Sequence, residues 1–174
     1  MKKYNFLILF VFFFLTYSNI FSQSEIDSLK NIFETAKTSI EKLDALLNLA
    51  QALKNTNNSE IIKFLDQADA LLKKNPDLAK SAKLDRYYAN YYSYKSDYKK
   101  ATEYFLQSIQ KAEDAEDYEL RNRAINDLAI LNVRTKNYKK GIELFQKLLD
   151  YSKETENEED VTFYSLNLAM ANAE

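Results

Sequence analysis

Residues 97–108 read DYKKATEYFLQS and residues 137–148 read NYKKGIELFQKL, so one pattern returns with Asn137 in the place of Asp97. A large residue followed by alanine recurs in the same register, at Leu49-Ala50, Tyr88-Ala89, Leu128-Ala129 and Leu168-Ala169. Self-similarity at a nearly fixed period of this size is typical of repeat proteins, in which each repeat is one supersecondary unit. The chain is therefore expected to be an array of similar units stacked in order.

Each unit reads as two helices joined by a short polar turn. In one unit, apolar residues lie at i, i+4, i+8 and i+11, at Leu120, Ala124, Leu128 and Leu131. This spacing places them on one face of a helix. A second helix with the same periodicity follows the polar turn at residues 135–137. The expected helices span residues 25–36, 39–55, 59–74, 77–95, 98–114, 118–135, 138–155 and 159–174.

Composition favours an all-α fold. The 174 residues include one glycine, Gly141, and one proline, Pro76, whereas ordinary chains carry roughly 7% and 5% of these residues. Few tight turns and no β-hairpin signals are left. Pro76 marks a break between helices, because proline disfavours helix before it and starts a helix well. Thr38 with Glu41 three residues later forms the pattern of a capping box at a helix start.

Missing residue types exclude most enzyme classes. The sequence has no histidine and no cysteine, which removes the commonest general base, the commonest metal ligands and every Ser-His or Cys-His nucleophile. A single glycine cannot build a phosphate-binding glycine loop. Acidic residues are plentiful, but no pair is visibly placed for glycoside hydrolysis. The sequence therefore predicts a protein that is not an enzyme and that needs no cofactor or metal.

The N-terminus has the pattern of an export signal. Lys2 and Lys3 precede the apolar run FLILFVFFFL at residues 6–15, and a small residue, Ser22, stands at the expected cleavage site. A basic start, an apolar segment of about ten residues and a small residue at the cut are typical of a secretory signal peptide. An uncleaved anchor is the alternative, although the run is short for a membrane span of roughly 17–25 residues. We expect residues 1–22 to be a signal peptide and the protein to be periplasmic or secreted in a Gram-negative bacterium.

Removing this segment leaves 22 basic and 26 acidic residues, a net charge of −4. Mild acidity makes nucleic acid an improbable partner, since binding to phosphates needs clustered positive charge. Contact with a membrane is expected only through an uncleaved signal or a further C-terminal part.

The repeat pattern resembles the tetratricopeptide repeat family over residues 39–174. The quoted motif carries the resemblance, with small residues at Ala101 and Gly141 and aromatics at Phe105 and Phe145 four residues later. The resemblance implies a right-handed superhelical solenoid of antiparallel helix pairs. Its period of about 40 exceeds the usual 34, and the family's tryptophan is absent. The implied organisation is an N-terminal helix at 23–38 and repeats at 39–76, 77–116, 117–156 and, incomplete, 157–174.

In that family, a concave groove lined by the first helix of each pair binds peptides of other proteins. The corresponding candidate residues are Lys83, Arg86, Asn90 and Tyr94 in one repeat and Arg123, Asn126, Ile130 and Arg134 in the next. Four of the eight are basic, so an acidic peptide or a free C-terminal carboxylate would suit them through charge-assisted hydrogen bonds. Otherwise they are ordinary solvated surface residues.

One subfamily binds chaperone C-termini with a carboxylate clamp of lysine, asparagine and arginine. Arg86 and Asn90 resemble part of this clamp. Asp127 stands where the clamp needs asparagine, and Phe163 and Asn167 stand where it needs basic residues. No such clamp is therefore expected.

Tyrosines cluster in one segment, with seven of thirteen between residues 87 and 104. They either pack at the core and its rim or form a binding hot spot, since tyrosine serves both roles. The repeat register assigns Tyr88, Tyr92 and Tyr98 to packing positions and leaves Tyr87, Tyr91 and Tyr94 exposed.

Two functions follow from these observations. The first is a free, exported scaffold that binds a partner protein or peptide in its groove. The second is the exported sensory input region of a longer membrane-bound signalling protein, such as a histidine kinase or a helix-turn-helix regulator, because bacterial tetratricopeptide proteins and sensors often begin with a similar region. The last helix, at 159–174, favours the second, since it is too apolar to cover the end of an array.

Overall fold

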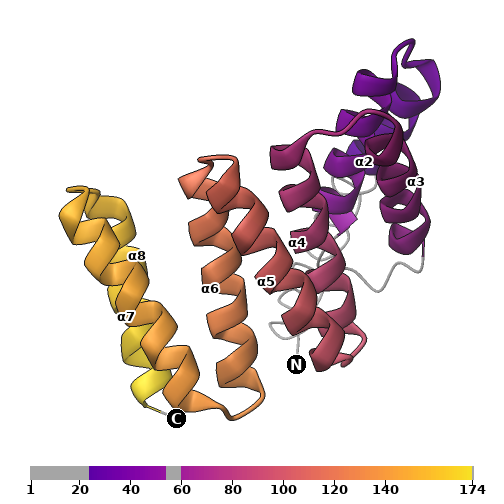
Figure 1. Cartoon of the computed structure of the whole chain (residues 1–174). Helices are drawn as coiled ribbons and strands as arrows, with labels where there is room; N and C mark the ends of the chain where they lie inside the picture. Colours follow the sequence, from indigo (N-terminus) through magenta and orange to yellow (C-terminus); the bar gives the residue numbers. More distant parts are fainter. Residues whose placement is uncertain (1–23, 54–59, 174) are drawn as a thin grey trace, which may run out of the picture. The chain divides into compact units, whose positions relative to one another are not determined.

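A computed structural model describes residues 24–53 and 60–173 of the chain (Figure 1). The predicted signal peptide lies outside the described residues. In the described part every regular element is a helix: residues 24–35, α2 (Ser39–Leu53), α3 (Ile61–Lys74), α4 (Leu78–Tyr94), α5 (Tyr98–Asp114), α6 (Tyr118–Arg134), α7 (Tyr138–Glu154) and α8 (Glu158–Asn172). Where both ends are described, these bounds lie within two residues of the predicted ones. The all-α fold of consecutive packed helices is confirmed.

The chain divides into two compact units, residues 1–71 and 72–174. In the first unit, the predicted pair Leu49 and Ala50 on α2 is fully buried, as are Leu65 and Ala68 on α3. These four residues hold the register positions that the repeat pattern assigns to the core. The first repeat, residues 39–76, therefore keeps the buried positions of the later repeats although it lacks their sequence motif.

The predicted capping box is present at the start of α2. Thr38 Oγ1 accepts a hydrogen bond from the Glu41 backbone N–H at 3.1 Å, and Glu41 Oε2 accepts from the Thr38 N–H at 3.0 Å. The backbone N–H groups of Thr38 and Lys37 lower the pKa of Glu41, because they stabilise its charged form. Donors that a helix start would otherwise leave unsatisfied are thus paired.

Helices α4 to α8 of the second unit begin at evenly spaced positions: Leu78, Tyr98, Tyr118, Tyr138 and Glu158. Each of the first four has 17 residues and is followed by a connection of three. The middle residue of each connection adopts a left-handed conformation: Ser96 (φ 62°), Glu116 (55°), Lys136 (64°) and Glu156 (55°). The third residue donates its N–H to the carbonyl five positions earlier, as in Asp97 N to Tyr92 O at 2.9 Å. This is the Schellman closure of a helix C-terminus.

The third residue of the connection also starts the next helix. The side chains of Asp97, Asp117 and Asn157 each accept a hydrogen bond from the N–H three residues later, at 3.3, 3.0 and 3.1 Å. Asn137 differs, because its Nδ2 donates to Asn132 Oδ1 at 2.9 Å. One short polar residue therefore both closes one helix and caps the next, which explains how turns form with almost no glycine.

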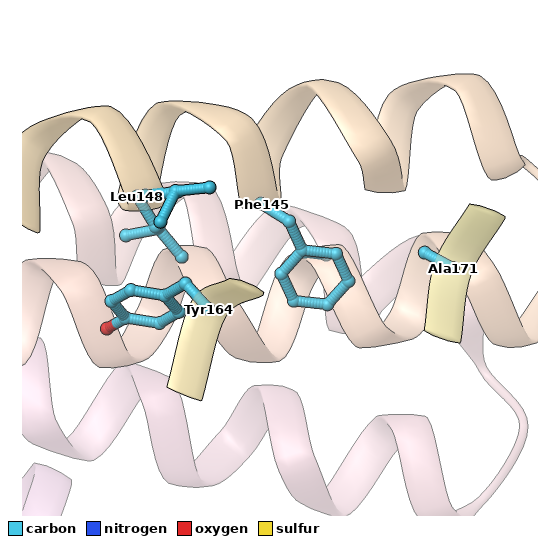
Figure 2. Close-up of a cluster of buried hydrophobic side chains, with 6 residues drawn as sticks. Phe145, Leu148, Tyr164 and Ala171 are labelled. Atoms are coloured by element: carbon cyan, nitrogen blue, oxygen red, sulfur yellow. The ribbon is translucent and has the colours of Figure 1, made fainter. Parts of the chain in front are cut away.

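Neighbouring helices of the second unit pack in order along the chain, and α4 also packs against α6. Figure 2 shows Phe145 and Leu148 of α7 against Tyr164 and Ala171 of α8, in a cluster that also holds Ala129 and Leu149. The equivalent Phe105 of α5 lies in a second cluster with Ala89, Ala101, Leu128 and Leu131. The aromatic residue of the repeat motif is thus buried in each cluster.

Tyrosine packing is confirmed in part. The rings of Tyr88 and Tyr92 stack on Tyr104 with centroid distances of 5.0 and 5.5 Å. The expectation that Tyr87 is exposed is wrong, because only 1% of its surface is accessible. A helix that packs against both α5 and α6 buries more than one face. Tyr98, expected at a packing position, is 40% exposed because it opens α5 at the turn.

Gly141 permits close approach of α6 and α7. A Cβ atom at this position would lie 2.6 Å from Val133 Cγ2 and 3.1 Å from Ala129 O. In the preceding repeat the same two positions are Ala101 and Ser93. A larger residue on one helix is therefore matched by a smaller one on the other.

We predict that Gly141→Ala lowers the free energy of unfolding by about 1–3 kcal/mol through overpacking, although alanine is the better helix former. The double variant Val133→Ser/Gly141→Ala copies the combination at Ser93 and Ala101, and it should be more stable than Gly141→Ala alone. Denaturant unfolding followed by circular dichroism measures both, with Val133→Ser as the control. A Gly141→Ala variant as stable as the parent would contradict the close contact.

Candidate functional site

The candidate groove residues lie on α4 and α6, the first helices of two successive repeats. We call the surface that carries them the interaction face, defined by the eight residues Lys83, Arg86, Asn90, Tyr94, Arg123, Asn126, Ile130 and Arg134. Tyr94, Arg123, Ile130 and Arg134 are exposed or partly exposed, Lys83 and Asn90 are half-buried, and Arg86 and Asn126 are buried. The face therefore combines accessible side chains with polar groups that are engaged within the chain.

Arg86 forms an ion pair with the next repeat. Its Nε donates to Asp127 Oδ2 at 2.7 Å, and the two side chains are only 11% and 18% exposed. Asn90 Nδ2 donates to the same carboxylate oxygen at 3.4 Å. Removing one partner of such a buried pair leaves an uncompensated charge, so the contact strongly favours the observed register of α4 and α6.

These contacts explain the missing carboxylate clamp. Arg86 and Asn90 do bind a carboxylate, but it belongs to Asp127 of the same chain. The aspartate that departs from the clamp pattern therefore occupies the donors that a ligand would need. No further basic side chain completes a clamp at Phe163 or Asn167.

Arg134 joins the C-terminal ends of α4 and α6. Its Nη2 donates to the backbone oxygen of Ser93 at 2.7 Å and to its hydroxyl at 2.5 Å. The guanidinium also lies over the Tyr98 ring, 5.4 Å from its centroid. Both acceptors on Ser93 are neutral, so the positive charge of Arg134 is held in place but not cancelled by them.

A third polar contact links α6 to α8. Asn167 Nδ2 donates to Asn126 Oδ1 at 3.1 Å. The pairs Arg86–Asp127, Ser93–Arg134 and Asn126–Asn167 are each separated by 41 residues. This separation is one residue more than the repeat period. Each contact therefore joins a residue to the one that directly follows its equivalent in the next repeat. The three pairs form a ladder across α4, α6 and α8.

Sequence reasoning missed three residues that belong to the same rows. Phe163, Leu166 and Met170 of α8 lie one repeat period after Arg123, Asn126 and Ile130. They are 48%, 60% and 63% exposed. We call these three residues the α8 stripe. The repeat period reaches the last helix and had placed Phe163 in the clamp register, but these three apolar residues were not counted among the groove candidates.

Comparison with protein-family models gives one match, to the family described as Soluble NSF attachment protein, SNAP, over residues 28–164. The chain belongs to the soluble NSF attachment protein family. No curated protein matches the chain, and no solved structure matches it.

The soluble NSF attachment protein family is a helical-repeat family whose fold serves as a protein-interaction scaffold. The predicted repeat architecture and a protein partner are confirmed at this level. Membership of the tetratricopeptide repeat family proper, the exported location and the acidity of the partner stay predictions.

Metal and membrane features were also sought in the described residues. There, no group of three or more Asp or Glu side chains could hold a metal ion. None of the helices described is both long and apolar enough to cross a membrane.

Two buried tyrosines near the face, Tyr87 and Tyr164, have raised pKa values. Burial raises the pKa of Tyr87 to about 12, against the opposing influence of Arg86 and Arg123. Burial, with a contribution from the Asp160 carboxylate, raises the pKa of Tyr164 to about 12. Arg123 acts on both rings, one on α4 and one on α8.

A tyrosine with a raised folded-state pKa stabilises the fold fully below pH 10 and loses that contribution as the pH rises from 10 to 12. We predict that the parent's melting temperature falls more steeply over this range than that of Tyr87→Phe/Tyr164→Phe. Thermal melts at pH 8, 10 and 11.5 measure the difference, in which shared effects of lysine titration cancel. Parallel curves for the two proteins would refute the burial of these phenols.

Proposed function

We propose that this chain is a non-catalytic scaffold that binds a partner protein or peptide on the interaction face of α4 and α6. The observation that carries the proposal is that some side chains of this face are paired within the chain while others beside them are accessible. Arg86 and Asn126 are buried and paired within the chain, whereas Tyr94, Arg123 and Ile130 are accessible beside them. Exposed aromatic and arginine side chains on a pre-ordered support are what binding hot spots use.

Charge favours an acidic partner segment. Arg134 is held by neutral groups of Ser93, and Lys83 lies 6.0 Å from the Tyr87 ring centroid. Arg123 pairs with Glu119, but both side chains are exposed, and such surface pairs contribute little. One carboxylate of the partner can therefore exchange with Glu119, and others along the segment can reach Lys83 on α4 and Arg134, which lies about 15 Å or more away along α6.

A family described as an attachment protein supports a protein partner for this chain. The mild negative charge of the mature chain gives no support to a nucleic-acid partner. Absence of histidine and cysteine supports a scaffold without catalytic activity.

We infer the site of action from residues 1–22. Their basic start, apolar run and small residue at the cut support export to the periplasm or secretion in a Gram-negative bacterium. The alternative function is the exported sensory input region of a longer membrane-bound signalling protein.

Site-specific photo-crosslinking in the cell that makes the protein tests the scaffold function. A photoreactive phenylalanine analogue replaces Tyr94 or Ile130 on the face, or Leu106 on α5 as a control with similar exposure. We predict a discrete crosslinked protein from positions 94 and 130 and none from position 106. In the same experiment, Arg123→Glu/Arg134→Glu should reduce the crosslinked fraction by about tenfold, since it replaces attraction by repulsion.

The product should be the same from both face positions, because one partner spans both helices. Equal crosslinking from position 106, or a discrete product that appears only there, would contradict binding on this face. A product that survives the double charge reversal would retain the scaffold function and contradict the acidic partner.

A further inference from the structure

Helix α8 packs against α7 with one side, and another side is exposed to solvent. Tyr164 and Ala171 lie in the buried cluster with α7 (Figure 2), and Val161 and Leu168 pack against it. The α8 stripe, Phe163, Leu166 and Met170, lies at i, i+3 and i+7 outside this cluster. Two turns of helix thus present three large apolar side chains to solvent, each about half or more exposed. Contiguous exposed apolar surface with a polar rim marks interaction sites in soluble proteins.

The stripe borders a hollow of about 500 Å³. Its lining residues are Glu159, Asp160, Thr162, Phe163 and Leu166. Apolar side chains and carboxylates therefore line the same space. The group that fits such a space has an apolar body and a positively charged neighbour.

The charge of the segment around α8 itself is of one sign, while Lys153 lies beside Glu156 and Glu158, and Arg123 acts on the Tyr164 ring. Residues 154–174 contain six acidic residues and no basic residue. The acidic members are Glu154, Glu156, Glu158, Glu159, Asp160 and Glu174. This segment differs from the interaction face of α4 and α6, where arginines and lysine predominate. Charge complementarity at α8 therefore calls for a basic partner.

We propose that the α8 stripe, together with Glu159 and Asp160, is a docking surface for an amphipathic basic helix of another protein. The partner helix carries apolar side chains at i, i+3 or i+4, and i+7, which lie against Phe163, Leu166 and Met170. Lysine or arginine at one end of that helix lies over Glu159 and Asp160. A helix suits the stripe because its apolar side chains repeat along about 10 Å of axis, as those of α8 do.

A second copy of this chain fits the surface poorly. Pairing two α8 helices in parallel would place the acidic first turns together. Pairing them antiparallel would place Glu158, Glu159 and Asp160 opposite residues 166–172, which contain no base. The acidic groups would thus meet either like charges, which cost several kcal/mol across an interface, or no charge at all. Charge therefore disfavours a second copy of this chain as the occupant.

This surface continues the rows of the proposed scaffold face onto α8, but it uses other residues and carries the opposite charge. A partner could occupy either surface without the other, so the two proposals stand or fall separately.

Binding of designed peptides to the full chain tests the proposal. The probe is a fluorescent peptide of about 18 residues with leucines at helical spacing and lysines at one end. Two matched peptides replace the lysines by glutamates or the leucines by serines. Fluorescence anisotropy at low and high salt measures affinity. We expect the lysine–leucine peptide to bind at least about tenfold more tightly than either matched peptide, and to weaken in high salt.

Protein variants locate the site. Phe163→Ser/Leu166→Ser and, separately, Glu159→Lys should each weaken binding by about tenfold or more. Leu106→Ser removes a leucine that is 54% exposed on α5 and should leave binding unchanged. All replaced side chains are at least partly exposed, and an unchanged melting temperature shows that the fold is intact. Met170→Lys provides a second stripe variant if the double variant unfolds.

Equal affinity for the lysine and glutamate peptides would overturn the proposed partner chemistry. Loss of binding in Leu106→Ser, or unchanged binding in both the stripe variants and Glu159→Lys, would overturn the site. Arg123→Glu/Arg134→Glu should bind the lysine–leucine peptide at least as tightly as the parent does, because Arg123 acts on Tyr164 of α8, and this separates the result from the scaffold test.

Discussion

The three-residue turn between helices is the constraint on which the rest of the second unit depends. Ser96, Glu116, Lys136 and Glu156 each adopt a left-handed backbone conformation without being glycine. That conformation costs roughly 1–2 kcal/mol for an ordinary residue. The Schellman hydrogen bond and the cap made by the next residue offset the cost. Because the turn recurs at an even interval, it fixes both the length of each helix and its position against its neighbours.

The fixed spacing accounts for the polar ladder across α4, α6 and α8. Only when successive first helices keep the same length and offset can Arg86 meet Asp127 and Asn126 meet Asn167, both at a separation of 41 residues. The ladder satisfies the buried side chains of Arg86 and Asn126. What remains exposed, from Tyr94 to the α8 stripe, is available for other molecules.

The helices could be predicted from the sequence because independent signals agree with the apolar period. The capping pattern at Thr38 marks the start of α2, and Pro76 marks the break before α4. The partners of side chains on the interaction face could not be predicted. Whether Arg86 faces solvent or Asp127 depends on how far α6 is shifted along α4, and the repeat period alone does not state that shift. The expectation for Tyr87 was wrong for another reason: α4 has two neighbouring helices, α5 and α6, and therefore buries more than one face. The eight candidate residues do share one pair of helices, but four of them also make contacts that hold the helices together: Arg86, Asn90, Asn126 and Arg134.

A double-mutant cycle on Arg86 and Asp127 tests most directly whether the repeats are locked in this register. The free energies of unfolding of the parent, Arg86→Ala, Asp127→Ala and the double variant are compared by denaturant unfolding. The observed ion pair predicts that both single variants are destabilised and that the pair is coupled by about 1–3 kcal/mol. Effects that add within roughly 0.3 kcal/mol would show that the two side chains do not meet, and would contradict the ladder and the face built on it.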